Sequence, residues 1–367
     1  MQLTRRFVVL CAVGLTTTLS VQAGDPSSFD SPTAQAIDQL LLDHVQPEQP
    51  GAAVIAVRDG EIVFRGAYGL ANMELQVPME PHMVFRIASL AKQFTATGIL
   101  ILVERGQIAL DDDIRKYLPG YPSSGRLITI RHLLTHTSGI PDTYANPRWQ
   151  DVKRDDLPPE AVIDLFKDEP LDFTPGEQFK YVNSGYFLLG QIIEAVSGKS
   201  YEQFLKEEIF EPLGMVATQT EPVYRIIPWR VSGYNFVEGE FIRYGFLNMD
   251  HIQGPGNLRS TVDDLAKWDA ALYTESLLPT DTLEMLWTPS TLASGESTNY
   301  GFGMGIGELD GHHMVAHRGN INGFDAYSLR LPESRIYVAL FMNHGNPEVG
   351  SGDLAENVAR LLLTDRP

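Results

Sequence analysis

Cysteine is almost absent from this chain of 367 residues. Its one cysteine, Cys11, lies in an apolar segment near the N-terminus that we expect to be removed. The remaining chain would then contain no thiol, so a cysteine nucleophile, a thiolate metal site and a disulfide framework are all excluded. Beyond that segment the sequence also lacks an apolar run long enough to span a bilayer.

Residues 1–23 have the pattern of a secretory signal peptide. Arg5 and Arg6 form a positive start, an apolar stretch follows, and Val21-Gln22-Ala23 resembles a cleavage site. We therefore expect an exported protein, periplasmic or secreted, whose mature domain, residues 24–367, is not stably inserted in a membrane. The alternative is a membrane-tethered protein that keeps the segment, but the apolar run is short and contains three threonines and a serine.

Clusters of positive charge are missing as well. The chain has 28 basic and 47 acidic residues, a formal charge of −19, and both signs are spread along its length. Because phosphate backbones are bound by clustered lysine and arginine, nucleic acid is not expected as a partner. The acidic balance indicates solubility and says nothing about the substrate.

Several familiar catalytic patterns are also lacking. No Gly-x-Ser-x-Gly elbow occurs, which argues against an α/β-hydrolase fold. His132 and His136 are four residues apart, but Leu133 stands where a zinc peptidase has glutamate. Gly198-Lys199-Ser200 lacks the earlier glycine of a phosphate-binding loop. We accordingly expect neither a metal ion nor an organic cofactor.

The order of apolar patterns predicts one antiparallel sheet built from both ends of the chain, with a mostly helical lobe inserted into it. This is an α+β fold in which helices at the two ends flank the sheet. The expected elements, in chain order, are a helix at 31–44, a hairpin turning at 58–60, a loop at 70–84, a helical lobe at roughly 105–222 that includes helices at 129–134 and 200–210, a helix at 260–272, a strand at 300–307, a hairpin turning at 332–334 and a helix at 352–363.

One short stretch holds a candidate nucleophile and base. Ser89 and Lys92 form a Ser-x-x-Lys motif at the start of a predicted helix. Residues three apart share one helix face, so the Lys92 amine can reach the Ser89 hydroxyl. The helix N-terminus and burial both disfavour the ammonium form of Lys92, which makes it a plausible base. The same N-terminus can aim the backbone N–H of Ser89 at a developing oxyanion.

Tyr181-Val182-Asn183 is a second candidate motif. A phenol beside a lysine ammonium is held toward phenolate, so Tyr181 would accept the Ser89 proton and return it to the leaving group. The Asn183 amide can hold Lys92 and donate to a substrate carbonyl. On its own, Tyr181 would be interpreted as a core or rim aromatic.

His317-Arg318-Gly319-Asn320 is the third candidate, just before the last predicted hairpin. A strand here can line the cleft opposite Ser89. Gly319 would let the substrate approach, and the backbone N–H of Asn320 would complete an oxyanion hole. On its own, His317 would be interpreted as a structural histidine.

These three motifs, in this order, resemble those of the serine β-lactamase and D,D-peptidase superfamily, which includes penicillin-binding proteins. Class A members have Ser-Asp-Asn and Lys-Thr-Gly as their second and third motifs. The Tyr-x-Asn and His-x-Gly patterns here are instead similar to the class C β-lactamase-like branch. The similarity covers roughly residues 35–360, and three further stretches resemble signatures of that branch: 133–141, 208–215 and 258–268.

The resemblance implies a β-lactamase-like fold and a metal-free serine hydrolase. It makes Ser89 the acylated nucleophile, with Lys92 and Tyr181 sharing the base and acid work. Asn183 would help to position the substrate, and the N–H groups of Ser89 and Asn320 would form the oxyanion hole. The remaining residues of the third motif would belong to the same substrate-binding strand.

Two positions depart from the family pattern. His317 replaces a lysine, and a histidine is a weaker, switchable charge near neutral pH. Arg318 replaces a small hydroxyl residue. Its guanidinium can either bind a carboxylate or point to solvent, because side chains alternate along a strand. Both departures argue against strong β-lactamase activity.

The sequence thus predicts a hydrolase that forms an acyl-enzyme on Ser89 and releases it to water. The expected substrates are D-amino-acid peptides, as for a D-alanyl-D-alanine carboxypeptidase-like enzyme, or related small-molecule amides and esters, with β-lactam hydrolysis as a weak side activity. Two alternatives stay open: a carboxylesterase of the same family, and a catalytically inactive binding protein on this fold. Retention of Ser89, Lys92 and Tyr181 speaks against the latter. The sequence does not predict an oligomeric state.

Overall fold

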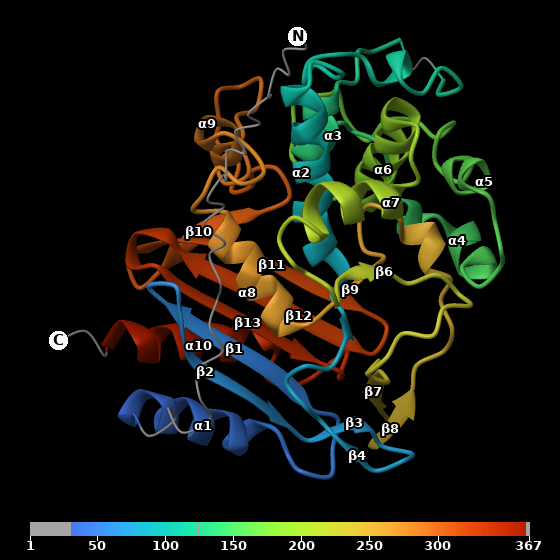
Figure 1. Ribbon diagram of the computed structural model, residues 1–367. Coiled ribbons are helices and arrows are strands. Elements are labelled where there is room, and N and C mark those ends of the chain that lie inside the picture. Colours follow the sequence, from blue (N-terminus) through green and yellow to red (C-terminus); the bar gives the residue numbers. More distant parts are fainter. Residues whose placement is uncertain (1–30, 123–124, 365–367) are drawn as a thin grey trace, which may run out of the picture.

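The computed structural model describes residues 31–122 and 125–364, so the predicted signal peptide lies outside the described residues. An antiparallel six-stranded sheet forms one half of the molecule, and helices from the middle of the chain form the other (Figure 1). Across the described ranges, none of the helices combines the length and apolar character needed to cross a membrane.

The large sheet joins the two ends of the chain. Strand β1 pairs with the last strand in antiparallel register, from Ala52 opposite Met342 to Arg58 opposite Ile336. The predicted α+β fold, with a sheet built from both ends, is therefore confirmed. The order across the sheet is β10 (Gly305–Leu309), β11 (His312–Ile321), β12 (Phe324–Leu331), β13 (Ile336–Met342), β1 (Ala52–Arg58) and β2 (Glu61–Tyr68).

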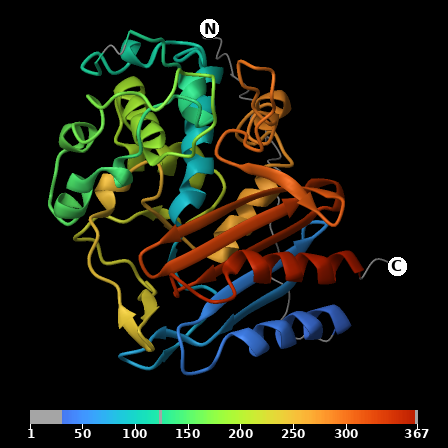
Figure 2. The ribbon, with the colours of Figure 1, turned by 180° about the vertical axis from the view of Figure 1, so that it is seen from behind.

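Side chains of β1 alternate between two separate cores. Every second residue from Ala52 to Ala56 packs under α1 (Pro32–His44) and α10 (Ser351–Thr364). The residues between them, from Ala53 to Val57, face the opposite core, which includes α8 (Val262–Ala271). Figure 2 shows α1 and α10 side by side against one face of the sheet. Burial on both faces explains why β1 is an almost continuous apolar run.

Helix α2 (Ala91–Glu104) is the centre of the helical half. All of its residues from Ala91 to Leu102 are buried, and it packs along α6 (Asn183–Ser197). Since α2 starts at the sheet and runs into the helical half, residues at its N-terminus lie between the two layers (Figure 1). The helices around it are short: α3 (Ile130–Leu134), α4 (Pro147–Val152), α5 (Pro159–Ile163), α7 (Tyr201–Leu205) and, further along the chain, α9 (Thr280–Glu284).

In the described part of the chain, three smaller sheets accompany the large one. They hold short strands that pair in the orders β5–β9–β6, β3–β4 and β7–β8. Their bounds are β3 (Leu70–Asn72), β4 (Val77–Pro78), β5 (Phe85–Arg86), β6 (Gln219–Thr220), β7 (Tyr234–Val237), β8 (Glu240–Arg243) and β9 (Leu258–Ser260).

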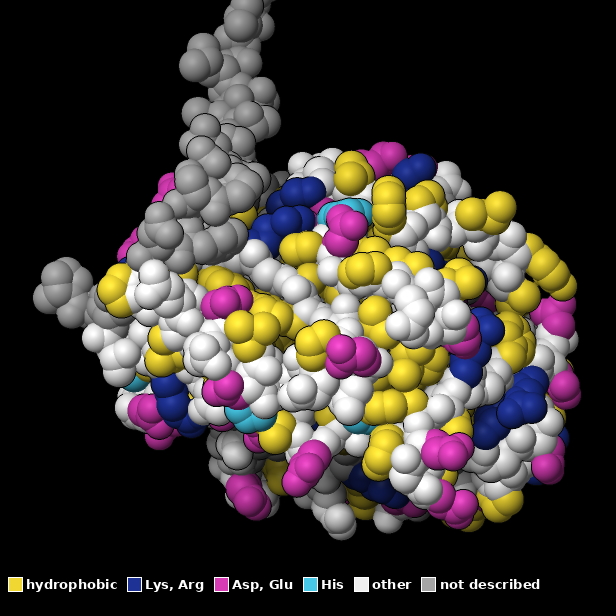
Figure 3. All heavy atoms as spheres, turned by 90° about the horizontal axis from the view of Figure 1, so that it is seen from below, with side chains coloured by type: hydrophobic (Ala, Val, Ile, Leu, Met, Phe, Trp, Pro, Cys, Tyr) yellow, Lys and Arg dark blue, Asp and Glu magenta, His cyan; other side chains and the backbone are white. Residues whose placement is uncertain are grey.

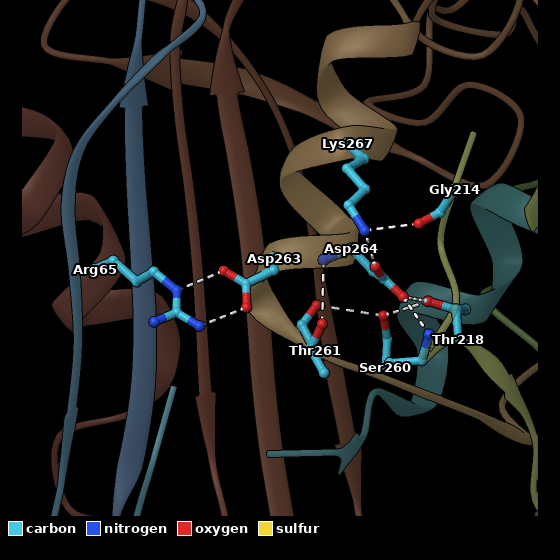
Figure 4. A network of polar contacts seen from close by, with 9 residues as sticks. Arg65, Gly214, Thr218, Ser260, Thr261, Asp263, Asp264 and Lys267 are labelled. Carbon is cyan, nitrogen blue, oxygen red and sulfur yellow. Dashed lines mark hydrogen bonds and ion pairs between the residues drawn. The ribbon is translucent and has the colours of Figure 1, made fainter. Parts of the chain in front are cut away.

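A buried carboxylate fastens α8 to the loop that follows the helical half. Asp264 accepts hydrogen bonds from the Ala217 N–H at 2.9 Å and from the Thr218 hydroxyl at 3.0 Å (Figure 4). Lys267, one turn along the helix, bonds to Asp264 at 2.7 Å and to the Gly214 carbonyl at 2.6 Å. These bonds hold the 214–218 loop on α8, and α8 in turn packs on β1 and β13.

Three elements differ from the sequence expectations. The predicted loop at 70–84 contains the β3–β4 pair, and β5 follows directly after it. The predicted strand at 300–307 begins only at Gly305, because Gly303 has a φ of 80° and lies where a Cβ would come within 2.7 Å of the Lys92 carbonyl oxygen. The helix at 200–210 is α-helical to Leu205 and continues as a π-helical turn to Phe210.

Candidate active site

A cleft of about 510 Å³ lies between the sheet and the helical half. Residues of all three predicted motifs line it, although they come from distant parts of the chain. Those residues are Ser89, Tyr181, Asn183, His317, Arg318 and Asn320. Among the residues that the structure describes, no group of three or more His, Cys, Asp or Glu side chains is arranged to hold a metal ion.

Ser89 is presented by a constrained turn. It lies in η2 (Ala88–Leu90), a 3₁₀ turn that leads directly into α2. The preceding residue, Ala88, has a left-handed φ of 45°, a conformation that a residue other than glycine keeps only when its surroundings impose it. The turn therefore places the serine at the mouth of the helix, in the position that the sequence predicted.

Lys92 is fully buried and contacts three oxygens. Its Nζ lies 3.1 Å from Ser89 Oγ, 2.9 Å from Asn183 Oδ1 and 3.1 Å from the Pro255 carbonyl oxygen. Burial lowers the pKa of Lys92 to about 7, although the Asp142 carboxylate acts in the opposite direction. The amide and carbonyl oxygens can only accept, so a neutral amine donates its two hydrogens to them and turns its lone pair toward Ser89. This arrangement suits removal of the hydroxyl proton.

Tyr181 is a neutral phenol, so the predicted phenolate is wrong. Burial of its hydroxyl raises its pKa, and the Asp142 carboxylate adds to that shift, whereas a hydrogen bond with Ser89 acts in the opposite direction. The Lys92 Nζ does not offset this, because it lies over the face of the Tyr181 ring, 4.7 Å from the centroid, and burial disfavours its ammonium form. The ring is still 38% exposed, which leaves it open to a substrate in the cleft.

His136, which was not among the predicted site residues, holds Tyr181 in place. Its Nδ1 accepts a hydrogen bond from the Val182 N–H at 3.3 Å, and its carbonyl accepts one from the Lys180 N–H at 2.9 Å. The two rings also pack together, with centroids 4.3 Å apart. Its place in the 133–141 signature stretch was the one signal that could have identified it.

Asp142 orients the other residue of the second motif. Its Oδ1 accepts the backbone N–H of Asn183 at 2.8 Å, and this N–H is one of the free donors at the start of α6. Asn183 is thereby held where its side chain meets Lys92. Asp142 also belongs to the connection after the 133–141 stretch, so that segment supports both ends of the Tyr-x-Asn motif.

His317 is a neutral histidine, which corrects the expectation of a switchable charge. Its Nδ1 lies 2.8 Å from the Arg318 carbonyl oxygen, which can only accept, so Nδ1 carries the hydrogen. Its Nε2 therefore accepts from the Tyr300 hydroxyl at 3.0 Å. Burial lowers the pKa of His317 to about 3, and the charge of Lys92 acts in the same direction.

The Arg318 side chain lies on the far face of β11. Arg318 is directly opposite Tyr327, whose ring packs against the core under α10. Its Nε donates to Asp325 Oδ1 at 2.7 Å, and the second oxygen of that carboxylate accepts the Ser351 N–H at the start of α10. Arg318 therefore does not face a substrate carboxylate. Because side chains alternate along the strand, its guanidinium points away from the cleft, and it is paired with a carboxylate of the protein itself.

Gly319 allows β11 to touch the Ser89 turn. A Cβ at this position would lie 2.1 Å from the Ile87 carbonyl oxygen and 3.2 Å from the Ser89 nitrogen. The glycine therefore serves contact between two backbones as well as access for a substrate. The Asn320 side chain donates to the Gly345 carbonyl at 2.8 Å, which fixes this end of the strand. The role of the Asn320 N–H in an oxyanion hole stays a prediction.

The chain is similar to a family of known hydrolases. A model of the beta-lactamase family matches residues 35–363. Penicillin-binding protein 4* of Bacillus subtilis (strain 168) is 34% identical, over 79% of this chain and 67% of that relative. A D-aminopeptidase of Gluconobacter oxydans (strain 621H) is 30% identical, over 80% of this chain, which spans only 56% of that relative's length. Among solved structures, the D-amino acid amidase of Ochrobactrum anthropi SV3 superimposes with a TM-score of 0.78 at 25% identity, and the match covers 92% of this chain and all of that one.

Proposed function

Since this chain belongs to the beta-lactamase family, we propose that it is a serine hydrolase that forms an acyl-enzyme on Ser89. The contacts of Lys92 carry the proposal. A buried amine with two obligatory acceptors and one hydroxyl as its partners is arranged as a base for that hydroxyl. Its lowered pKa, about 7, keeps much of it unprotonated at neutral pH.

The reaction starts when Lys92 takes the hydroxyl proton and Ser89 Oγ attacks the substrate carbonyl carbon. The oxyanion that forms is stabilised by the N–H groups of Ser89 and Asn320. Tyr181, as a neutral phenol beside Ser89, gives its proton to the leaving nitrogen or oxygen, and the proton held by Lys92 replaces it. Water then attacks the acyl-enzyme with the proton transfers reversed, which returns the hydroxyl to Ser89.

D-Amino-acid amides, esters and peptides are the proposed substrates. Support comes from similarity to proteins named D-aminopeptidase and D-amino acid amidase. The third motif narrows the class of substrates, because His317 is neutral and the Arg318 guanidinium is paired with Asp325. A carboxylate next to the scissile bond therefore meets no available cation on this strand. We expect leaving groups without a carboxylate to react faster than C-terminal D-amino acids, and β-lactams to react slowly.

Intact mass after treatment with a fluorophosphonate tests the acyl-enzyme. The wild type is expected to gain one adduct on Ser89, and Ser89→Ala none. Ser276→Ala, an exposed serine outside the cleft, is the matched control and should react like the wild type. Absence of an adduct in the wild type would favour the inactive binding protein.

Substrate preference is tested by comparing kcat/KM for D- and L-alanine amides and esters, D-alanyl-D-alanine peptides and a penicillin. Preference for D-amides and D-esters over peptides with a free C-terminus is the expected result. Equal hydrolysis of simple esters of either hand, without amide hydrolysis, would favour the carboxylesterase. Efficient penicillin hydrolysis would contradict the argument from His317.

We also propose that residues 1–23 direct export and are removed. The positive start, the apolar stretch and the Val21-Gln22-Ala23 sequence support this. The mass of the protein recovered from the periplasm or medium of an expressing host tests it. A chain beginning at Gly24 is expected, and a membrane-bound product that keeps residue 1 would contradict export with cleavage.

A further inference from the structure

A second cavity, of about 380 Å³, lies beside the catalytic cleft. Consecutive parts of one segment line the two cavities: Asn320 and Ile321 line the cleft, and Asn322 and Phe324 line the second cavity. The short helix η6 (Met249–Ile252) also contributes to both, because Met249 lines the second cavity and Ile252 lines the cleft. We name the second cavity the arginine pocket, after four lining residues: Arg86, Arg230, Arg243 and Arg259.

Positive charge exceeds negative charge in the arginine pocket. Among the described residues that line it, Glu221 is the only acid. It pairs with Arg86 at 2.7 Å and Arg259 at 2.7 Å, and Arg230 lies 3.7 Å away. One carboxylate thus faces three guanidinium groups. On the lower face as a whole, acidic and basic side chains are interspersed (Figure 3).

Burial makes this local excess costly. The side chains of Glu221, Arg86 and Arg259 are only 7%, 12% and 3% exposed, so water screens them weakly. Burial lowers the pKa of Arg259 to about 10; Glu221 opposes that shift, and the charges of Arg86 and Arg230 add to it. A second anion in the pocket would compensate the excess.

The two more exposed arginines are the ones that a ligand can reach from solvent. Arg230 is 46% exposed, and Arg243 is 72% exposed, with Glu74 as its nearest acid at 3.9 Å. Both can turn toward a ligand at little cost, because neither is held by a close ion pair. Arg86 and Arg259 are each held by Glu221 at 2.7 Å, so the pocket combines two fixed guanidinium groups with two that form no close ion pair with the described residues.

The walls of the pocket are apolar. The Phe324 ring lies beneath the guanidinium groups of Arg86 and Arg259, with its centroid 5.9 Å from Arg86 Cζ and 5.7 Å from Arg259 Cζ. Further apolar side chains line it: Val223, Val231, Phe246, Leu247 and Met249. Guanidinium groups bind carboxylate and phosphate through paired hydrogen bonds, and an apolar wall accommodates the carbon chain that carries such a group.

We propose that the arginine pocket binds an oxyanion, a carboxylate or a phosphate, carried by a remote arm of the substrate whose scissile bond lies at Ser89. Arg86 is three residues before Ser89, a span of at most ~10–11 Å between their Cα atoms. About three residues of an extended peptide bridge that maximum distance. The proposal rests on the proposed function, because one molecule occupies both cavities.

Direct binding tests the pocket without catalysis. In a Ser89→Ala background, inorganic phosphate and succinate are titrated by calorimetry at constant ionic strength. Saturable binding is expected, and about tenfold weaker binding in Arg230→Gln/Arg243→Gln. Arg225→Gln is the control: it removes one positive charge from the segment between β6 and β7 that also holds Arg230, but Arg225 pairs with Glu202 and does not line the pocket. Binding of phosphate alone or of succinate alone identifies the group, and equal affinity in all three proteins overturns the proposal.

Paired substrates test the link to the reaction. N-succinyl and N-acetyl forms of one D-amino-acid ester differ by a remote carboxymethyl group, which carries the charge. The ratio of their kcat/KM values should favour the succinyl ester about tenfold in the wild type and Arg225→Gln, and fall to about one in the double variant. Hydrolysis without this discrimination overturns the pocket as a substrate site. Failure to hydrolyse either ester, with anion binding still lost in the double variant, overturns the proposed function and leaves the anion site supported.

Discussion

The Tyr300 hydroxyl lies 3.0 Å from Nε2 of His317, and this hydrogen bond makes one wall of the cleft neutral. The other ring nitrogen is engaged by the Arg318 carbonyl at 2.8 Å, so both nitrogens are used in the uncharged tautomer. Protonation of Nε2 would break the bond to Tyr300. The third motif therefore presents a hydrogen-bonded neutral ring where the family pattern has a lysine ammonium.

The neutral state of His317 predicts a pH dependence of stability. Its pKa is about 3 in the folded chain against an ordinary value of 6.5, so between these pH values the unfolded chain binds a proton that the folded chain does not. The free energy of unfolding should fall as pH decreases from about 6.5 toward 3, by up to about 1.4 kcal/mol per pH unit. Urea unfolding of the wild type and His317→Gln at pH 7, 6 and 5 measures this. In the variant, the free energy of unfolding should depend less steeply on pH. An identical pH dependence in both proteins would contradict the neutral state assigned to His317.

Lys92 sets the pH dependence of acylation. Because burial lowers its pKa to about 7, kcat/KM should rise with an apparent pKa near 7 and then level off, since the raised pKa of Tyr181 keeps the phenol protonated. A rise near pH 10 would indicate an ordinary exposed lysine instead. Lys92→Arg, which keeps a permanent charge, should reduce kcat/KM by about 10²–10⁴-fold. Stopped-flow measurement of adduct formation separates acylation from hydrolysis.

Gly319→Ala should disable the cleft without removing any reacting group. Its Cβ would lie 2.1 Å from the Ile87 carbonyl oxygen, so either β11 or the Ser89 turn must move. A shift of this size displaces the oxyanion site, and we expect kcat/KM to fall about 10²-fold or more. Gly120→Ala is the control, because nothing lies within 4 Å of its added Cβ. A variant with full activity would show that β11 does not position the nucleophile.

Two adjacent acids on α8 predict contrasting effects on stability. Asp264 is buried and accepts bonds from the 214–218 loop and from Lys267, whereas Asp263 forms a half-exposed pair with Arg65 (Figure 4). Asp264→Ala should lower the free energy of unfolding by about 3–5 kcal/mol, because it leaves buried donors without their acceptor. Asp263→Ala should cost no more than about 1 kcal/mol. Equal effects in guanidinium unfolding would contradict the role given to the buried network.

Local spacing was enough to predict part of the site. Ser89 and Lys92 are three residues apart on one helix face, and a helix guarantees their proximity whatever the rest of the chain does. The alternation of apolar residues and the turn at 332–334 likewise predicted the hairpin of β12 and β13. Motif resemblance supplied the remaining candidates, and the cleft contains Tyr181, Asn183 and His317 together with Ser89.

Ionisation states could not be predicted in the same way. The phenolate expected for Tyr181 assumed a lysine ammonium beside it, and the switchable charge expected for His317 assumed the ordinary pKa of a histidine. Burial reverses both expectations, since removing water disfavours whichever form is charged. Burial at these positions is created by packing of β11, α2 and α6, which the sequence around each residue does not encode locally.

The sequence by itself determined the candidate nucleophile and base, the order of the elements and the α+β class, because these depend on periodicity and on residues close together in the chain. Tertiary structure alone decided that His136 and Asp142 hold the second motif, that Arg318 turns away to Asp325, and that Glu221 gathers three arginines beside the cleft. Several of these partners are dozens of residues apart or more, and folding brings them within hydrogen-bond distance. Their charges acquire their strength from the low-dielectric interior, which exists only once the chain has folded.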